Sequence, residues 1–255
     1  MLTTIKKRQM TRITQIAIIG LLLTIIACNK NPKLSVNDHL TKANKYLVIC
    51  DFENGLKEFE LAKLIEPHNA EIYYSIGQTY FLLSDFKNAI NNYDKAIELN
   101  PKYIFAYYSR GLTKSFYGDN LGGQKDITKA IELKPDFIFA IFQRATFKNN
   151  QGDTQGAIDD ISLILRQKPD FANGYYYRGI FYGLKMEYEK AIADLSTSIK
   201  LKTDRTNAYV YRDAYEYSLG LKDKACDDFN KARELGDTTS IEYIKKYCLE
   251  QNDNK

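Results

Sequence analysis

The sequence predicts an all-α fold, in which six helical hairpins of 34 residues each stack into a solenoid. The first observation is the spacing of the prolines, because Pro67, Pro101, Pro135 and Pro169 recur at intervals of 34 residues. The stretch AIELNPKYIFAYYSRG, which ends at Gly111, returns 34 residues later as AIELKPDFIFAIFQRA. A fixed period of this length is typical of repeat architectures, in which each unit buries its apolar surface against its neighbours.

Residues 1–27 have the organisation of a secretory signal peptide. Four basic side chains precede a largely apolar run from Ile13 to Ala27, which is shorter than the roughly 20 residues of a membrane-spanning helix. Ala27 stands directly before Cys28, and this junction resembles the lipobox of bacterial lipoproteins. The resemblance implies that Cys28 is diacylated through its sulfur and becomes the first residue of the mature chain. An uncleaved anchor helix is the alternative.

Removal of the signal peptide would change the charge of the protein. The full sequence has a net charge of +4, and residues 1–27 contain four basic and no acidic residues, so the mature chain is formally neutral. A neutral protein lacks long-range attraction to the phosphate backbone of nucleic acids, so we expect no nucleic-acid partner. Residues 28–35 are expected to form a short lipidated linker that holds the rest of the chain close to a membrane.

Each repeat is expected to contain two amphipathic helices with a turn between them. In the second repeat, Ile72 and Ile76 have the spacing of one helix face. Small residues recur at the eighth and twentieth positions, represented here by Gly77 and Ala89, where two helices must approach closely. Glycines such as Gly118 mark the turn inside the repeat, since glycine readily takes a positive φ. The predicted repeats are 36–69, 70–103, 104–137, 138–171, 172–205 and 206–239.

The 34-residue period, with prolines at a constant phase and small residues at two fixed positions, resembles the tetratricopeptide repeat family over residues 36–239. The resemblance implies a right-handed superhelix, in which the first helix of each repeat lines a concave groove. Residues 240–255 begin like a seventh repeat and then become polar, so we expect a capping helix and a polar tail there. The sequence departs from the family pattern at Ile164, Ser198, Thr203 and Asp237.

Four repeats have an arginine at the seventh position and an aspartate at the twenty-third. Antiparallel helices would bring the two side chains of each pair level, and the next arginine would be level with the preceding aspartate. We therefore predict a ladder of partly buried ion pairs that sets the register of the stack, with an anion-binding stripe as the alternative. The ladder would consist of Arg110, Asp126, Arg144, Asp160, Arg178, Asp194, Arg212 and Asp228, extended by Lys246.

The resemblance also implies which side chains face the groove, namely those at the second, fifth, ninth and twelfth positions of the first helices. Aromatic and amide side chains suit a peptide ligand, because tyrosine offers contact area at low entropic cost and asparagine bonds to a backbone. Aromatic faces also suit sugar rings, and the tyrosines could instead pack between neighbouring first helices. The predicted groove residues are Tyr74, Tyr108, Phe142, Tyr176, Phe105, Phe139, Asn173 and Asn207.

The sequence shows no pattern that indicates an enzyme, a metal site or a cofactor. Its two histidines do not have a metal-ligand spacing with cysteine or carboxylates, and it has no phosphate-binding loop or nucleophile elbow. Cys226 and Cys248 are spaced symmetrically about the turn before the expected cap. We predict a disulfide between them outside the reducing cytosol, with two buried free thiols as the alternative, while Cys50 stays unpaired.

Together these features favour a non-enzymatic, monomeric scaffold of the bacterial cell envelope, anchored through acylated Cys28, with the outer membrane favoured over the inner. The groove would bind a peptide segment or helix of an envelope protein in assembly, secretion or pilus-type machinery. By resemblance, type IV pilus pilotin lipoproteins combine a lipid anchor with such repeats. A carbohydrate-binding lipoprotein that serves a glycan transporter is the alternative.

Overall fold

The computed structural model describes residues 34–202, residues 206–238 and Cys248. These residues form helices and turns without any strand, so the predicted all-α fold is confirmed for this part of the chain. The first three hairpins are α2 (Val36–Val48) with α3 (Phe52–Ile65), α4 (Ala70–Leu82) with α5 (Phe86–Leu99), and α6 (Ile104–Phe116) with α7 (Asn120–Leu133). The next three are α8 (Ile138–Asn150) with α9 (Thr154–Gln167), α10 (Ala172–Leu184) with α11 (Tyr188–Leu201), and α12 (Thr206–Ser218) with α13 (Lys222–Glu234).

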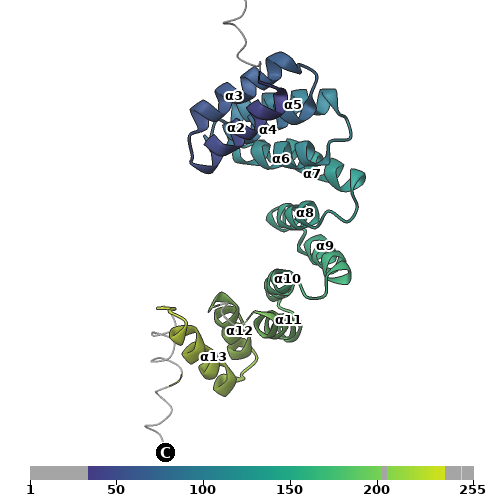
Figure 1. The fold of residues 1–255 in the computed structure, drawn as a ribbon. Coiled ribbons are helices and arrows are strands. Elements are labelled where there is room, and N and C mark those ends of the chain that lie inside the picture. Colours follow the sequence, from purple (N-terminus) through teal and green to yellow (C-terminus); the bar gives the residue numbers. More distant parts are fainter. Residues whose placement is uncertain (1–33, 203–205, 239–247, 249–255) are drawn as a thin grey trace, which may run out of the picture.

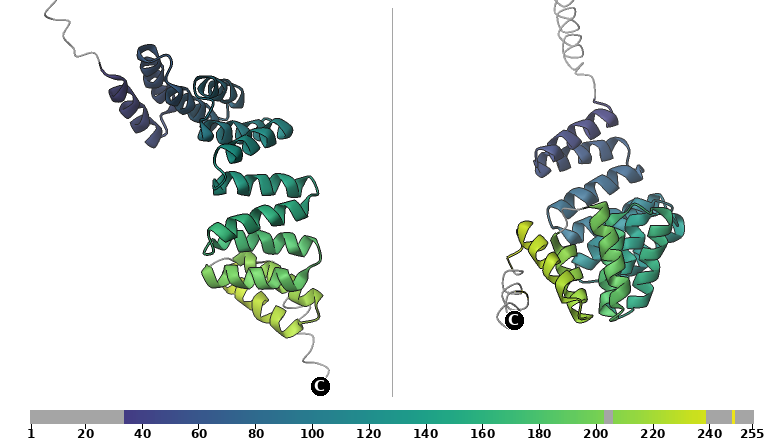
Figure 2. Two further views of the ribbon diagram at one scale, coloured as in Figure 1. Left: turned by 90° about the vertical axis from the view of Figure 1, so that its right-hand side faces the viewer. Right: turned by 90° about the horizontal axis from the view of Figure 1, so that it is seen from below.

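The hairpins are stacked in chain order along a curved path. Figure 1 shows the first helix of each pair, from α2 to α12, on the inner side of the arc and the second helices outside. The two views of Figure 2 show that the direction of the helices changes along the stack, so hairpins far apart in the sequence face different ways. Such a solenoid of adjacent helix pairs is the predicted architecture, and its inner side is formed by the helices expected to line the groove.

Each first helix is followed, two residues after its end, by a residue with positive φ, which turns the chain toward the second helix. The sequence predicted this conformation for glycines, and Gly118 and Gly152 have φ values of 98° and 87°. Gly220 of the sixth repeat has a φ of 77°, whereas in the first, second and fifth repeats the same place is taken by Cys50, Ser84 and Met186, residue types that adopt their φ near 60° less readily. The turn geometry is therefore set by the repeat as a whole and does not require glycine.

Close helix contacts explain the small residues at the eighth position of the repeats. A Cβ atom on Gly77 would lie 2.7 Å from the ring of Tyr93, and one on Gly111 would lie 2.9 Å from the carbonyl oxygen of Gly123. These distances are too short for any larger residue, so glycine is required for the helices to pack. In the last repeat the same position is occupied by Asp213, which is only 1% exposed.

Two departures from the family pattern are accommodated inside the core. Ile164 is fully buried in the apolar cluster between α7 and α10, where it fills space that alanine would leave. Ser198 is also fully buried, and its Oγ donates a hydrogen bond of 2.9 Å to the carbonyl oxygen of Ala172. Both positions therefore stay within the repeat geometry, with a larger apolar or a bonded polar side chain.

The signal peptide, Cys28 and nearly all of the predicted cap, including Lys246, lie outside the described residues, as does Thr203. Of the predicted linker, only Leu34 and Ser35 are described, and Ser35 caps the N-terminus of α2. None of the helices in the described ranges has both the length and the apolar character of a membrane span.

Candidate ligand-binding groove

The four predicted arginine–aspartate pairs are present, one inside each of the last four hairpins. Each arginine donates two hydrogen bonds to one carboxylate, from Nε to Oδ2 and from Nη2 to Oδ1. For Arg110 and Asp126 the two distances are 2.7 and 2.6 Å. The aspartates are buried, so these are the bidentate, partly desolvated pairs in which position is well defined. The members of the other pairs are Arg144 with Asp160, Arg178 with Asp194, and Arg212 with Asp228.

The contact between neighbouring repeats differs from the predicted ladder. Within the described residues, no ion pair joins an aspartate of the ladder to the arginine of the next repeat. Instead Nη1 of the arginine points back to the twenty-fifth position of the preceding repeat, two residues beyond the expected partner. Nη1 of Arg110 lies 2.6 Å from Oδ1 of Asp94, and Nη1 of Arg178 lies 3.1 Å from Oγ of Ser162. The offset arises because the helices of adjacent repeats cross at an angle and are not level along their lengths.

Lysines complete the pairs in two of these four repeats. Nζ of Lys114 lies 2.9 Å from Asp126, and Nζ of Lys148 lies 2.9 Å from Asp160. The pKa of Arg110 is raised because its hydrogen bonds and charge interactions with aspartates outweigh the burial that would lower it. With the arginine donors turned to carboxylates in this way, the geometry favours the structural ladder over an anion-binding stripe.

The predicted groove residues separate into exposed and packed side chains. Phe105 and Phe139 are 51% and 68% exposed, and both rings contact the buried ring of Phe137 between them. Asn173 and Asn207 are exposed as well. These side chains lie on the inner helices and are accessible to a ligand.

The remaining predicted groove aromatics are partly or fully packed. Tyr176 is only 8% exposed, and its ring lies against Tyr177 and Tyr211. Tyr108 and Phe142 are half-buried. The ring of Tyr108 lies against Phe137, and the ring of Phe142 lies against Tyr177 of α10. For these residues, packing between neighbouring first helices is the main role that the structure shows.

Tyr74 connects the inner surface to the core. Its ring contacts Tyr93 and Tyr103, and its Oη accepts a hydrogen bond of 2.9 Å from Nε2 of Gln78. Burial raises the pKa of Tyr103 to about 12, and the neighbouring Tyr74 adds to this shift. The Tyr103 phenol therefore stays protonated at neutral pH.

An apolar pocket of about 280 Å³ opens beside Tyr74, where the first three hairpins meet. Sequence reasoning placed Leu47 and Phe81 on the groove but did not predict the pocket, because its lining combines positions from three first helices with Tyr93 of a second helix. A helical wheel of one repeat does not show that these side chains meet across repeats. The pocket is lined by Leu47, Gln78, Phe81, Leu82, Tyr93, Ser109 and Leu112.

A second pocket, of about 430 Å³, lies between the last two hairpins. Its lining is more polar and includes Thr206 and Asn207 beside Tyr176 and Tyr177. Two of the predicted groove residues, Tyr176 and Asn207, therefore lie at one site, whereas the exposed phenylalanines lie nearer the middle of the stack.

The last repeat contains a group of acids that the sequence analysis missed. Asp213 and Glu216 are both buried, and Oδ2 of Asp213 and Oε2 of Glu216 have no hydrogen-bond partner among the described residues. Burial raises the pKa of Asp213 to about 8, with a further contribution from the charge of Asp228. Burial also raises the pKa of Glu216. The signal was available, since a charged residue stands at the eighth position where the other repeats have glycine or alanine.

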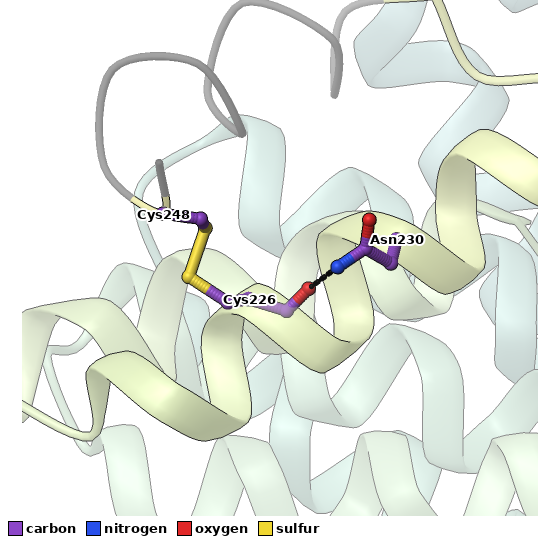
Figure 3. The surroundings of a disulfide bond; sticks show 3 residues. All are labelled: Cys226, Asn230 and Cys248. Carbon is purple, nitrogen blue, oxygen red and sulfur yellow. Dashed lines mark hydrogen bonds between the residues drawn. A yellow bond between two sulfur atoms is a disulfide. The ribbon is translucent and has the colours of Figure 1, made fainter. Parts of the chain in front are cut away.

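Cys226 and Cys248 form a disulfide with a Cα–Cα distance of 5.8 Å (Figure 3). It joins α13 to the one described residue of the predicted cap. Beside it, Nδ2 of Asn230 donates to the carbonyl oxygen of Cys226 at 2.9 Å. Cys50 is a free, exposed thiol in the turn of the first repeat.

Across the described ranges, no group of three or more histidine, cysteine or acidic side chains is arranged to hold a metal ion. The site is thus an apolar and aromatic inner surface, supplemented by amide and hydroxyl groups, and not a cluster of reactive side chains. Helical-repeat solenoids present extended concave surfaces of this kind, which are suited to binding a ligand.

Comparison with known proteins identifies the type of repeat. The family model of the tetratricopeptide repeat matches residues 70–103, the second hairpin. No curated protein has a sequence that matches the chain. Together with the similar solved structures described below, the match supports a tetratricopeptide-repeat protein.

Several solved structures share the fold. The crystal structure of the MamA protein is 26% identical, with a TM-score of 0.60, over 71% of this chain and 96% of MamA. YrrB, described as a TPR protein with an unusual peptide-binding site, is 22% identical, with a TM-score of 0.57, over 73% of this chain and 94% of YrrB. A tetratricopeptide repeat protein from Parabacteroides merdae is 20% identical, with a TM-score of 0.59, over 89% of this chain and 88% of the other.

Proposed function

We propose that this protein is a non-enzymatic interaction scaffold of the bacterial cell envelope, which binds an extended segment or helix of another protein along its inner surface. The observation that carries the proposal is the set of accessible aromatic side chains, Phe105 and Phe139, on the same inner surface as the apolar pocket beside Tyr74. Rigid aromatic rings and a preformed pocket are the features that anchor a peptide side chain.

Two observations support a location outside the cytosol. The sequence before Cys28 has the organisation of a lipoprotein signal, which would leave a diacylated cysteine at the start of the mature chain. The disulfide between Cys226 and Cys248 is a bond that persists in oxidising compartments. The segment from Asn29 to Ser35 reaches at most about 25 Å when fully extended, so the groove would be held near the membrane surface.

The likeness to YrrB supports a peptide as the ligand class, because that protein is described by its peptide-binding site. In this chain the exposed asparagines Asn173 and Asn207 lie on inner helices, where amide groups can bond to the backbone of a bound segment. We expect the partner to be an envelope protein of an assembly, secretion or pilus-type machine.

Site-specific crosslinking in intact cells tests this proposal. A photo-crosslinking phenylalanine analogue at Phe139, on the inner surface, is expected to capture an envelope protein. The same analogue at Leu64, which is 76% exposed on the outer helix α3, is the matched control. Equal capture at the two sites, or a glycan-array signal without any protein adduct, would contradict the peptide proposal, and the latter would favour a carbohydrate ligand.

Lipidation is tested separately. Cells that express the wild-type chain are expected to incorporate labelled palmitate into the protein, and the Cys28→Ser variant is expected to lose the label. A wild-type protein without label would remove the tether while leaving the groove to be judged by the crosslinking result.

A further inference from the structure

The edge of the solenoid at which the first helices end is lined by exposed apolar side chains in the first three repeats. Val48 is 84% exposed and Phe116 is 66% exposed, values that are unusual for large apolar residues. Each of these residues is the last residue of a first helix or the residue that follows it, and among them Leu82 also lines the apolar pocket described above. The six residues are Val48, Ile49, Leu82, Leu83, Phe116 and Tyr117, and we call them the apolar turn edge.

The apolar turn edge is continuous from one repeat to the next. The rings of Phe81, Phe86 and Phe116 contact one another across the second and third repeats, with centroids 5.6 to 5.8 Å apart. Leu47 and Leu82 line the same pocket and so connect the first repeat to the second. The exposed side chains therefore form one row supported by an aromatic layer, and not separate residues.

The opposite edge of the same repeats has a different composition. There the turns between these repeats expose proline with polar or charged residues, such as His68, Lys102 and Asp136. Exposed apolar side chains, such as Leu64 and Ile65 of α3, lie in the helix that leads into the turn. Along the apolar edge itself, the fourth repeat has the polar pair Asn150 and Gln151 in place of large apolar residues. In the fifth repeat the edge again exposes Leu184 and Met186, with the charged Lys185 between them. The unbroken apolar row therefore covers the three repeats that are nearest the N-terminal linker.

We propose that the apolar turn edge inserts into the surface of the lipid bilayer to which Cys28 is anchored; this proposal rests on the proposed lipid tether. Apart from Leu82, which borders the pocket, these side chains protrude from the ends of the first helices, and a lipid surface moulds around protruding apolar groups and buries them at the interface. Tyr117 adds an amphipathic ring of the kind that favours the headgroup region.

The length of chain before α2 permits this arrangement. α2 has 13 residues and is therefore about 20 Å long, and Val48 lies at its far end from the linker. The linker from Asn29 to Ser35 can extend to about 25 Å, which exceeds the length of the helix. The acyl chains can therefore reach the plane of the turn edge alongside α2.

Capping aspartates at this edge do not oppose the arrangement. Oδ1 of Asp51 and Oδ1 of Asp85 each accept a hydrogen bond of 3.2 Å from a backbone amide of the second helix. Their negative charge is offset by the positive end of that helix. Insertion is therefore expected to depend on apolar contact and not on anionic lipid.

A single tryptophan tests the proposal, because the natural sequence contains none. The acylated full chain with Phe116→Trp is mixed with vesicles of phosphatidylethanolamine and phosphatidylcholine, the latter brominated on its acyl chains. The matched control is Lys102→Trp, at an exposed position on the opposite edge. The brominated chains are expected to quench Phe116→Trp several-fold more strongly than Lys102→Trp, and circular dichroism is expected to show both variants folded.

The outcomes separate this proposal from the tether on which it rests. Equal quenching of the two tryptophans in a protein that incorporates palmitate would overturn the turn edge and leave the tether intact. If palmitate is not incorporated, the same vesicles are added to the unacylated chain. Stronger quenching of Phe116→Trp would then still support the edge, and equal quenching would overturn it.

Discussion

Repeats three to six each contain their own arginine–aspartate pair, but the residue at the eleventh position of the repeat differs between repeats three and four on one side and repeats five and six on the other. In the earlier repeats it is Lys114 or Lys148, and each lysine adds an ion pair to the same carboxylate. In the fifth repeat it is Tyr182, whose ring lies 5.9 Å from the guanidinium of Arg178. In the sixth it is Glu216, a buried acid that adds negative charge to the site.

The same helical hairpin can therefore hold the same ion pair in unequal electrostatic surroundings. Where a lysine is present, the aspartate has two cationic partners and tolerates the loss of one. Where tyrosine or glutamate stands, the arginine is the one cation paired with the buried aspartate in the described structure. Substitutions at Arg178, Arg144 and Asp213 test these unequal surroundings, and one at Cys248 tests how far the end of the stack influences the rest.

Substitution of Arg178 is expected to have the largest effect. In Arg178→Ala, Asp194 stays buried without a cation, and breaking such a pair typically costs about 3–5 kcal/mol. We expect the thermal unfolding midpoint to fall by on the order of 10 °C, from the usual relation between stability and melting. Circular dichroism melting measures it, with the exposed Lys200→Ala as control; equal midpoints in the two variants would refute the structural role of the ladder.

Arg144→Ala is expected to cost less, because Lys148 stays within 2.9 Å of Asp160. We expect a loss about 1–2 kcal/mol smaller than for Arg178→Ala, although still well above that of an exposed lysine. The double variant Arg144→Ala with Lys148→Ala is expected to lose as much unfolding free energy as Arg178→Ala. Strictly additive single and double effects in urea unfolding would show that the lysine does not compensate.

Asp213 is expected to make stability depend on pH. Its folded pKa is raised to about 8 from an ordinary value of 3.8, so the folded state holds a proton that the unfolded state releases between these values. The contribution of this group is therefore favourable at low pH and is lost as the pH rises toward 8. The neighbouring charged groups Glu216, Asp228 and Asp237 act in the same direction.

In Asp213→Asn this dependence should be reduced. We expect the variant to gain about 1–3 kcal/mol relative to the wild type near pH 8, the usual cost of a buried unpaired polar group, and little near pH 4. Urea midpoints at several pH values measure the difference, and the exposed Glu189→Gln serves as control. A parallel pH dependence in wild type and Asp213→Asn would contradict the assignment.

The disulfide is expected to have the smallest and most local effect. It ties α13 to Cys248 at the end of the stack, and a solenoid transmits stability mainly between neighbouring repeats. In Cys248→Ser we expect faster amide hydrogen exchange in α12 and α13, with α6 to α9 unchanged. Uniformly faster exchange along the whole chain would contradict a local role, and Cys50→Ser is the control.

Much of the fold followed from the repeat alone. The constant spacing from Pro67 to Pro169 and the apolar periodicity determined the number and type of elements, because a repeated unit can satisfy its packing only against copies of itself. The partners within each hairpin, such as Arg110 with Asp126, also followed, since two antiparallel helices joined by a short turn leave one register.

Contacts between repeats did not follow in the same way. Nη1 of Arg110 donates to Asp94, and Leu47 and Leu112 line one pocket. Neither contact can be read from the periodicity of one repeat, because both depend on how adjacent hairpins are placed. The amino-acid sequence alone was enough to predict a tandem stack of helix pairs, whereas the lipoprotein-type start of the chain stays a prediction. Only the tertiary structure decided which aromatic rings stay accessible, as Phe139 does and Tyr176 does not, because exposure depends on how neighbouring hairpins cross.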